Sequence, residues 1–216
     1  MRPKLENGRP ARPEELKGYR TVADLSPELW LDAAARPAAQ AAAGSGAVRR
    51  PDGKFVLSYM GGDYLLDLAG RSLGGPPGHL PADFQKALVL LSYLTHAQDL
   101  GLAGRMVAGR ELNGGDMFFT GPHTLRTAPV IQKFGRDPEA FLRKAAGLGL
   151  AREEQGAGYA CRGLVLPHIA VGCVLHPADE EFDAALTYTF DAYAHYHLPL
   201  DGLWAMINVL AEELAA

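Results

Sequence analysis

The chain has 216 residues, of which 48% are apolar and 21% charged, and its formal net charge is −4. Such a chain can bury a core of its own, which excludes a coiled coil, a collagen-like chain and wholesale disorder. The charge argues against nucleic acid as a partner, because binding to phosphates needs clustered Lys and Arg. There is no apolar run of 18 residues and no signal-peptide pattern. We therefore expect a cytoplasmic protein without membrane contact.

Residues 1–24 differ in character from the rest of the chain. They contain six Lys or Arg residues and three prolines, interspersed with Glu6, Glu14 and Glu15. We interpret them as a basic, Pro-rich, solvated N-terminal arm, and residues 25–216 as a single domain.

The first half of this domain predicts helices around a hairpin. Ser26 followed by Pro27 is typical of a helix start, and Pro37 interrupts a helix that resumes through alanines to residue 43. Residues 54–69 alternate like a hairpin with Gly61-Gly62 as its loop. That loop pairs apolar residues on one face: Tyr59 with Tyr64, Leu57 with Leu66 and Phe55 with Leu68. Residues 82–100 form an apolar helical stripe that is expected to cover this face.

The second half predicts further short elements. Residues 105–120 begin as a strand and continue as a second hairpin or a glycine-bent loop. Helices follow over 127–134 and from an Asp137 cap, and a last helix spans 200–214. Residues 159–175 form a hairpin that bends at Pro167-His168. The fold class is therefore α+β, with antiparallel hairpins packed against a central apolar helix and a C-terminal helix.

The bend at Pro167 would set Cys161 across from Cys173. We favour two small buried thiols, and a disulfide, a redox pair or a metal pair remain open. Two cysteines are too few for an iron–sulfur cluster of the protein's own, since common clusters take four thiolates. Any cluster nearby would come from a partner.

The segment from residue 176 to residue 197 concentrates polar chemistry. Its imidazoles and carboxylates could bind a transition-metal ion or supply a general acid and base. The candidate metal ligands are His176, Asp179, Glu180, His195 and His197, with Glu181, Asp183 and Asp191 nearby. The favoured alternative is a helix with acidic residues in its first turn and a stripe of Phe182, Leu186, Phe190 and Tyr193. Residues 186–190 also alternate like a strand, so the local structure stays open.

Three further histidines lie outside this segment. His96 lies on the predicted central helix, where a core histidine is favoured and an axial haem or corrinoid ligand is the alternative. His79 and His123 lie in Pro/Gly loops and are expected to be exposed. No phosphate loop, dinucleotide fingerprint, nucleophile elbow or zinc-protease motif occurs, so an enzymatic activity is weakly supported.

In their order and spacing, several segments of the chain resemble those of the domain-of-unknown-function family DUF 3786, which is found mainly in anaerobic bacteria. The resemblance spans about residues 55–210. Its pieces are the hairpin 55–68, Leu90-Leu91-Ser92-Tyr93-Leu94, Arg110-Glu111-Leu112-Asn113-Gly114-Gly115, Phe134-Gly135, Pro167, Asp179-Glu180-Glu181-Phe182, Phe190-Asp191 and Leu198-Pro199-Leu200-Asp201.

The resemblance implies an accessory or ligand-binding role, since some members are joined to iron–sulfur modules or occur beside one-carbon and corrinoid metabolism. The first hypothesis is a non-catalytic module that binds a tetrapyrrole, haem or corrinoid, with His96, His176, His195 or His197 as the axial ligand. The second is a metal-dependent enzyme that uses the segment 176–197. The third is an adaptor that docks on a redox or methyl-transfer protein. Oligomeric state and substrate stay open.

Overall fold

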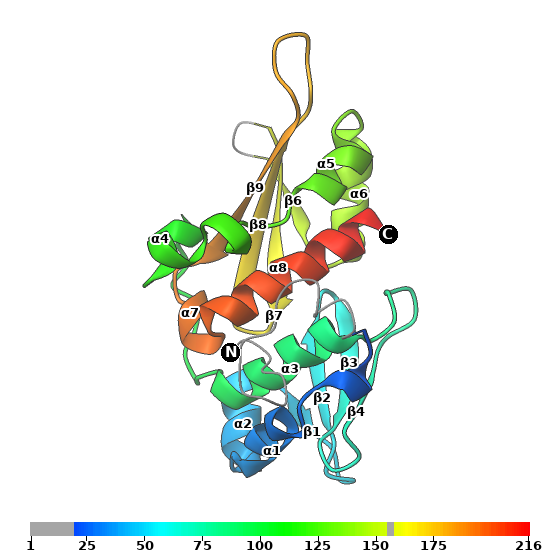
Figure 1. Cartoon of the computed structure of the whole chain (residues 1–216), viewed down its shortest axis with the longest axis vertical. Helices are drawn as coiled ribbons and strands as arrows, with labels where there is room; N and C mark the ends of the chain where they lie inside the picture. The colour runs from blue at the N-terminus through cyan, green and yellow to red at the C-terminus, as the bar shows by residue number, and fades with distance from the viewer. Residues whose placement is uncertain (1–19, 155–157) are drawn as a thin grey trace.

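The computed structural model describes residues 20–154 and 158–216. This part of the chain forms a four-stranded sheet of order β1-β2-β3-β4 and a five-stranded sheet of order β5-β9-β8-β7-β6. All neighbouring strands are antiparallel. The two sheets lie at opposite ends of the long axis, and helices α3 and α8 cross the middle of the molecule between them (Figure 1). The predicted α+β class is confirmed.

The N-terminal helices follow the sequence signals closely. A 3₁₀ turn, η2 (Val22–Asp24), precedes α1 (Pro27–Ala35) and α2 (Ala38–Ser45). The Ser26 side chain accepts a hydrogen bond from the Glu28 N–H at the start of α1, as a cap does. Proline at position 37 separates the two helices, because it has no N–H to donate. Most of the predicted N-terminal arm, residues 1–19, lies outside the described residues.

The first sheet contains the predicted hairpin in a shifted register. Its strands are β1 (Val48–Arg49), β2 (Phe55–Tyr59), β3 (Gly62–Asp67) and β4 (Ser72–Gly74). Tyr59 pairs with Gly62, not with Tyr64, so the loop residues are Met60 and Gly61, with φ of 52° and 76°. A tight two-residue hairpin loop of this kind needs a positive φ at both positions. The Met60 N–H also donates to the Val165 carbonyl at 2.9 Å, which holds the loop against the second sheet.

The predicted register is therefore wrong by two residues, yet the predicted buried face is right. Side chains alternate with a period of two along a strand, so a shift of two leaves the same side chains inside. The buried members of that face are Phe55, Leu57, Tyr59, Tyr64 and Leu66.

The second sheet contains the second predicted hairpin. Its strands are β5 (Met106–Ala108), β6 (Ala151–Glu153), β7 (Tyr159–Leu166), β8 (Ile169–His176) and β9 (Ala185–Asp191). Cys161 and Cys173 face each other in the register of β7 and β8 as predicted, and both are free buried thiols. The hydrogen bond that the Cys173 thiol makes to Cys161 raises the pKa of Cys173, and burial raises it further.

The segment after β5 is a glycine-bent loop, and the alternative of a second hairpin is wrong. β5 pairs with β9, and the chain continues through η3 (Gly109–Glu111) into the short helix α4 (Gly115–Phe118). Gly115 passes so close to the Gly109 carbonyl that a side chain would collide with it. The run of apolar residues at 117–119 thus belongs to a helix end and not to a strand.

The remaining helices are η4 (Gly121–His123), α5 (Ala128–Phe134), α6 (Pro138–Gly147), α7 (Ala194–His197) and α8 (Leu200–Ala215). The Asp137 side chain caps α6 by accepting the Ala140 N–H, as predicted. Among the described residues, no helix has the length and apolar character needed to cross a membrane.

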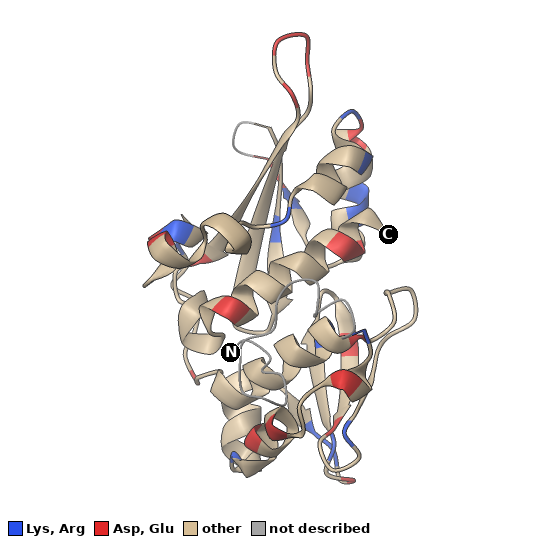
Figure 2. Cartoon of the chain, viewed as in Figure 1, with Lys and Arg blue, Asp and Glu red and all other residues tan. Residues whose placement is uncertain are grey.

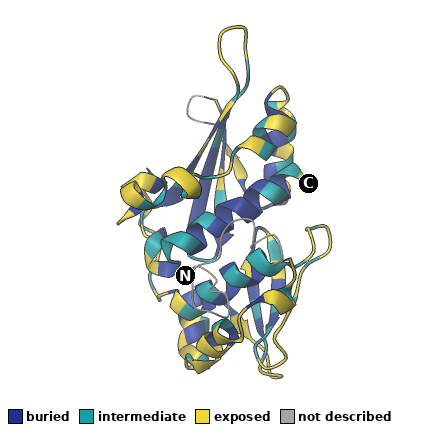
Figure 3. Cartoon of the chain, in the orientation of Figure 1, coloured by how far each residue is buried: buried dark blue, intermediate teal, exposed yellow. Residues whose placement is uncertain are grey.

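Helices α3 (Phe84–His96) and α8 form the middle of the core. Figure 2 shows few charged residues along these two helices, and Figure 3 shows that α8 is buried over most of its length. The charged residues buried on these helices are Lys86 on α3 and Glu213 on α8, each only 1% exposed. Their charged atoms lie 2.6 Å apart.

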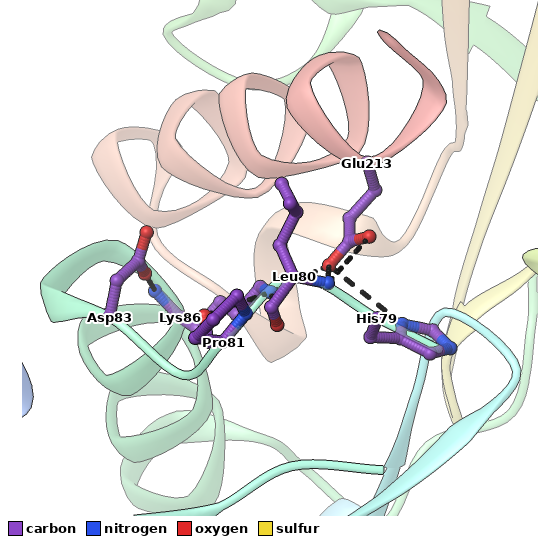
Figure 4. Close-up of polar contacts among 6 residues, drawn as sticks. All are labelled: His79, Leu80, Pro81, Asp83, Lys86 and Glu213. Carbon is purple, nitrogen blue, oxygen red and sulfur yellow. Dashed lines mark hydrogen bonds and ion pairs between the residues drawn. The ribbon is translucent and has the colours of Figure 1, made fainter. Parts of the chain in front are cut away.

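The loop before α3 completes this ion pair. Glu213 points from α8 toward Lys86 and the loop (Figure 4), and both of its oxygens accept the Leu80 N–H, at 3.1 and 3.2 Å. Lys86 also donates to the carbonyls of Leu80 and Pro81. Every charged atom of the pair therefore has partners, which is the condition for two charges to be tolerated inside a core.

We expect Lys86→Met to lower the free energy of unfolding by about 3 to 5 kcal/mol, because it leaves the Glu213 carboxylate buried without its partner. The double variant Lys86→Met/Glu213→Leu should lose less than the sum of the two single changes. Urea unfolding measures both effects.

The exposed pair of Arg152 and Glu139, 3.1 Å apart, is the control. Arg152→Ala should change stability by less than about 1 kcal/mol. A Lys86→Met protein as stable as the Arg152→Ala protein would contradict a central role for the buried pair.

Candidate functional site

The candidate ligand His96 lies at the end of α3 and is exposed, so its interpretation as a core histidine is wrong. The helix ends at this residue, which turns the ring out of the apolar stripe. Its Nδ1 lies 2.8 Å from the Ser92 carbonyl oxygen. Because a carbonyl only accepts, Nδ1 is the donor in this contact.

The structure separates the predicted segment 176–197 into two groups. His176 ends β8 opposite Ala185, and Asp179 and Glu180 are exposed in the connection to β9. This connection projects beyond the body of the molecule, and Figure 2 shows acidic residues along it. Asp179 accepts the N–H groups of Glu181 and Phe182, which lowers the pKa of its carboxyl.

The other group, His195 and His197, follows the opposite end of β9. Residues 185–191 form a strand, so the favoured prediction of a helix through Phe182, Leu186, Phe190 and Tyr193 is wrong. Cross-strand pairing with β8 outweighed the local helical pattern. Six strand steps of about 3.3 Å put the two groups roughly 20 Å apart. The five candidate metal ligands are therefore not brought together.

A third histidine, His168, joins His195 and His197. His168 lies in the β7–β8 turn, and the other two lie on α7, just before α8. The rings of His168 and His197 are stacked, with centroids 5.3 Å apart and an angle of 28° between their planes. We call His168, His195 and His197 the histidine cluster. The sequence marked the bend at Pro167-His168 but contained no signal that it would reach α7.

Four ring nitrogens of the histidine cluster are buried and have no hydrogen-bond partner in the described part of the chain. They are Nδ1 and Nε2 of His197, Nε2 of His168 and Nδ1 of His195; the Gln98 backbone approaches His197 without forming a well-aligned hydrogen bond. Buried polar atoms are nearly always paired, so four orphaned nitrogens in one place require an explanation such as a bound water, ion or ligand.

Asp191 fixes the backbone around the histidine cluster. Its carboxylate is 1% exposed and accepts the N–H groups of Ala103, Gly104 and Tyr193, at 2.9, 2.9 and 3.0 Å. It thereby ties the loop after α3 to the entrance of α7. The N–H of His168 donates to the Tyr93 hydroxyl at 3.1 Å, which anchors the β7–β8 turn to α3.

The His197 ring is neutral at ordinary pH. Its burial, together with the neighbouring His168, lowers its pKa from 6.5 to about 4, although Asp191 and the backbone of Gln98 act in the opposite direction. A neutral imidazole has a free lone pair, which is the form that coordinates metals.

Aromatic side chains surround the outer side of the cluster. Tyr193 and Tyr196 are 39% and 45% exposed, and their rings meet edge to face with centroids 5.6 Å apart. The His195 ring lies 4.1 Å from that of Tyr196. His195 is partly exposed and its Nδ1 is buried, so Nε2 is the nitrogen that an external group can reach.

A second polar cluster surrounds the Lys86–Glu213 pair. His79 was expected to be exposed, and this is wrong: its side chain is 9% exposed and its Nδ1 lies 3.8 Å from Glu213. The hydroxyls of Tyr59 and Tyr64 are buried there without a partner in the described residues. Burial raises the pKa of both tyrosines. The signal that sequence reasoning missed is a lysine and a glutamate on otherwise apolar helical faces.

The donor geometry limits what metal chemistry the molecule can support. Within residues 20–154 and 158–216, no three His, Cys, Asp or Glu side chains are grouped as ligands of one metal ion. A bare transition-metal ion usually takes three or more side chains as ligands. A metal that already carries its own equatorial ligands needs only one or two imidazoles.

Comparison with known proteins adds the family. Residues 38–213 match the family described as a domain of unknown function, DUF3786. The chain belongs to this family. No curated protein and no solved structure matches the chain. The DUF3786 match covers α2 to α8, so both sheets and the histidine cluster lie within the family domain.

The lowered pKa of His197 makes the stability of this DUF3786 protein depend on pH. Between pH 6.5 and about 4 the unfolded state binds a proton that the folded state does not, so stability falls as the pH drops through this range. We expect a contribution of up to about 2 kcal/mol, after allowance for screening by solvent. His197→Gln should flatten this part of the curve.

The measurement is urea unfolding at a series of pH values with a chelator present. His96→Gln, which removes an exposed imidazole, is the control and should reproduce the wild-type slope. A wild-type slope in His197→Gln would show that His197 is protonated normally in the folded protein.

Proposed function

We propose that this protein is a non-catalytic ligand-binding module whose ligand is a planar cofactor with a central metal, such as a haem or a corrinoid. His195 would supply the axial ligand. The observation that carries the proposal is the partly exposed His195 ring, which lies beside the exposed Tyr196 ring and next to the buried, unpaired nitrogens of the histidine cluster.

The choice of a planar cofactor rests on the number of donors. A tetrapyrrole fills four positions of its metal and leaves one or two for the protein, and a single histidine is a common axial ligand. A bare transition-metal ion usually takes three or more side chains, which the described residues do not group together.

The surroundings of His195 suit a flat ligand. Tyr193 and Tyr196 present exposed rings on the same short segment, and an aromatic face can pack against the face of a macrocycle. His197 and His168 stack on each other in the same cluster. The backbone around the site is held by Asp191, which gives the ligand a fixed platform.

The experiment is a titration of the purified protein with haemin and, separately, with aquocobalamin, followed by visible absorption. Replacement of metal-bound water by imidazole shifts the spectrum of either probe. We expect a saturable shift with the wild type, and a loss of affinity of at least about tenfold in His195→Ala.

His176→Ala is the matched control, because it removes an equally plausible histidine from the far end of β9. It should bind as the wild type does. The proposal fails if neither probe shifts, or if His195→Ala and His176→Ala behave alike.

The metal-dependent enzyme is the weaker candidate, because it needs side chains from both ends of β9 at one metal. An accessory role beside a redox or methyl-transfer protein is compatible with cofactor binding. It would be supported by recovery of such a partner together with the cofactor.

A further inference from the structure

A groove far from the histidine cluster lies between the helices α1 and α2 and the first sheet. Its volume is about 370 Å³, within the size range of small-molecule sites. Residues from α1, α2, β1, β2 and the β3–β4 turn line it, so it is built by five elements of the fold.

The interior of the groove is apolar. Trp30 and Phe55 form part of it and are 2% and 3% exposed, and Leu68 is partly buried beside them. Leu31 also lines the groove and is 58% exposed. An apolar body placed here would cover Leu31 and be removed from water.

The polar residues that line the groove are all cationic. Arg36, Arg49 and Arg71 contribute to its wall, and no acidic residue does so among the described residues. Arg36 already donates to the carbonyls of Leu94 and Ala97, at 2.8 and 2.6 Å. Arg36 therefore adds positive charge to the groove wall, and its hydrogen bonds also hold the end of α3.

Arg49 and Arg71 are different, because neither guanidinium has a hydrogen-bond or ion-pair partner within residues 20–154 and 158–216. The nearby carboxylates are engaged elsewhere: Asp52 pairs with Arg50 at 3.5 Å and Asp67 with Lys54 at 3.1 Å. The groove thus has two guanidinium groups that have no protein partner in the described part of the chain and lie next to apolar side chains.

The backbone of Arg71 supports a role for its side chain. Arg71 has φ of +49°, a conformation that favours glycine, whereas the preceding residue, Gly70, does not adopt a positive φ. A glycine at position 71 would fit this turn with less strain. The turn chemistry alone therefore does not account for an arginine here.

We propose that this groove binds a small molecule that has an apolar body and one carboxylate. The apolar body occupies the space beside Trp30, Phe55 and Leu68. The carboxylate pairs with Arg49 and Arg71, whose planar guanidinium groups match its two oxygens. This site is independent of the histidine cluster and of the function proposed for it.

Trp30 lines the groove, so its fluorescence emission can report the binding of a ligand there. The chain contains two tryptophans, so Trp204→Phe leaves Trp30 as the single emitter. Decanoate is the probe, used below its micelle-forming concentration. Decanol, which lacks the charge, and decyltrimethylammonium, which reverses it, are the comparison compounds. We expect a saturable change in Trp30 emission with decanoate, and binding at least about tenfold weaker with the other two.

Arg71→Gly and Arg49→Gln are the test variants, and Arg50→Gln, outside the groove lining and already paired with Asp52, is the matched control. Each test variant should weaken decanoate binding at least about tenfold, the factor that the loss of one charge-assisted hydrogen bond implies. Arg71→Gly should keep or raise the melting temperature, which separates lost binding from lost folding. Arg50→Gln should bind as the parent does.

Isothermal titration calorimetry of the unmodified chain repeats the comparison without Trp204→Phe, so a folding defect in that variant cannot hide the result. Three outcomes would overturn the proposal. They are no saturable decanoate binding by either method, decanol binding as tightly as decanoate, and equal losses in Arg50→Gln and the two test variants.

Discussion

The buried ion pair of Lys86 and Glu213 joins the two helices that connect the halves of this molecule. Helix α3 lies with the first sheet and α8 with the second, and the two halves meet where these helices pack together and where β2 contacts β7. Two charges removed from water are favourable only when both are fully paired, so the pair demands one particular register of α3 against α8. The loop at Leu80 is drawn into the same arrangement through its N–H and carbonyl groups.

This register decides what lies at the other end of the two helices. Once Lys86 and Glu213 are aligned, the end of α3 lies beside α7 and the start of α8, and the β7–β8 turn reaches Tyr93. The histidine cluster forms there from two segments that are more than twenty residues apart in the chain. At the opposite end of the helices the two charges are paired, although the hydroxyls of Tyr59 and Tyr64 are buried there without a partner among the described residues.

The two proposed sites use different chemistry and different parts of the chain. The histidine cluster combines neutral donors with exposed tyrosines at the end of the second sheet. The groove beside Trp30 lies at the first sheet. It combines apolar side chains with arginines that have no partner among the described residues. Both lie on connections and element ends that a rigid core positions, which is where binding residues are most often found. The core itself has little room for chemistry.

Local signals determined most of the secondary structure from sequence alone. Ser26 with Pro27 and Asp137 with Pro138 mark helix starts by capping, and the alternation around Gly61 marks a hairpin, because these effects act within a few residues. The buried face of that hairpin was also predictable, since alternation survives a register shift of two. The tertiary structure decided the rest: the strand at 185–191 and the burial of His79 both depend on partners distant in sequence. For the same reason the sequence could point to His195 and His197, but only the packing of α3 on α8 could place His168 beside them.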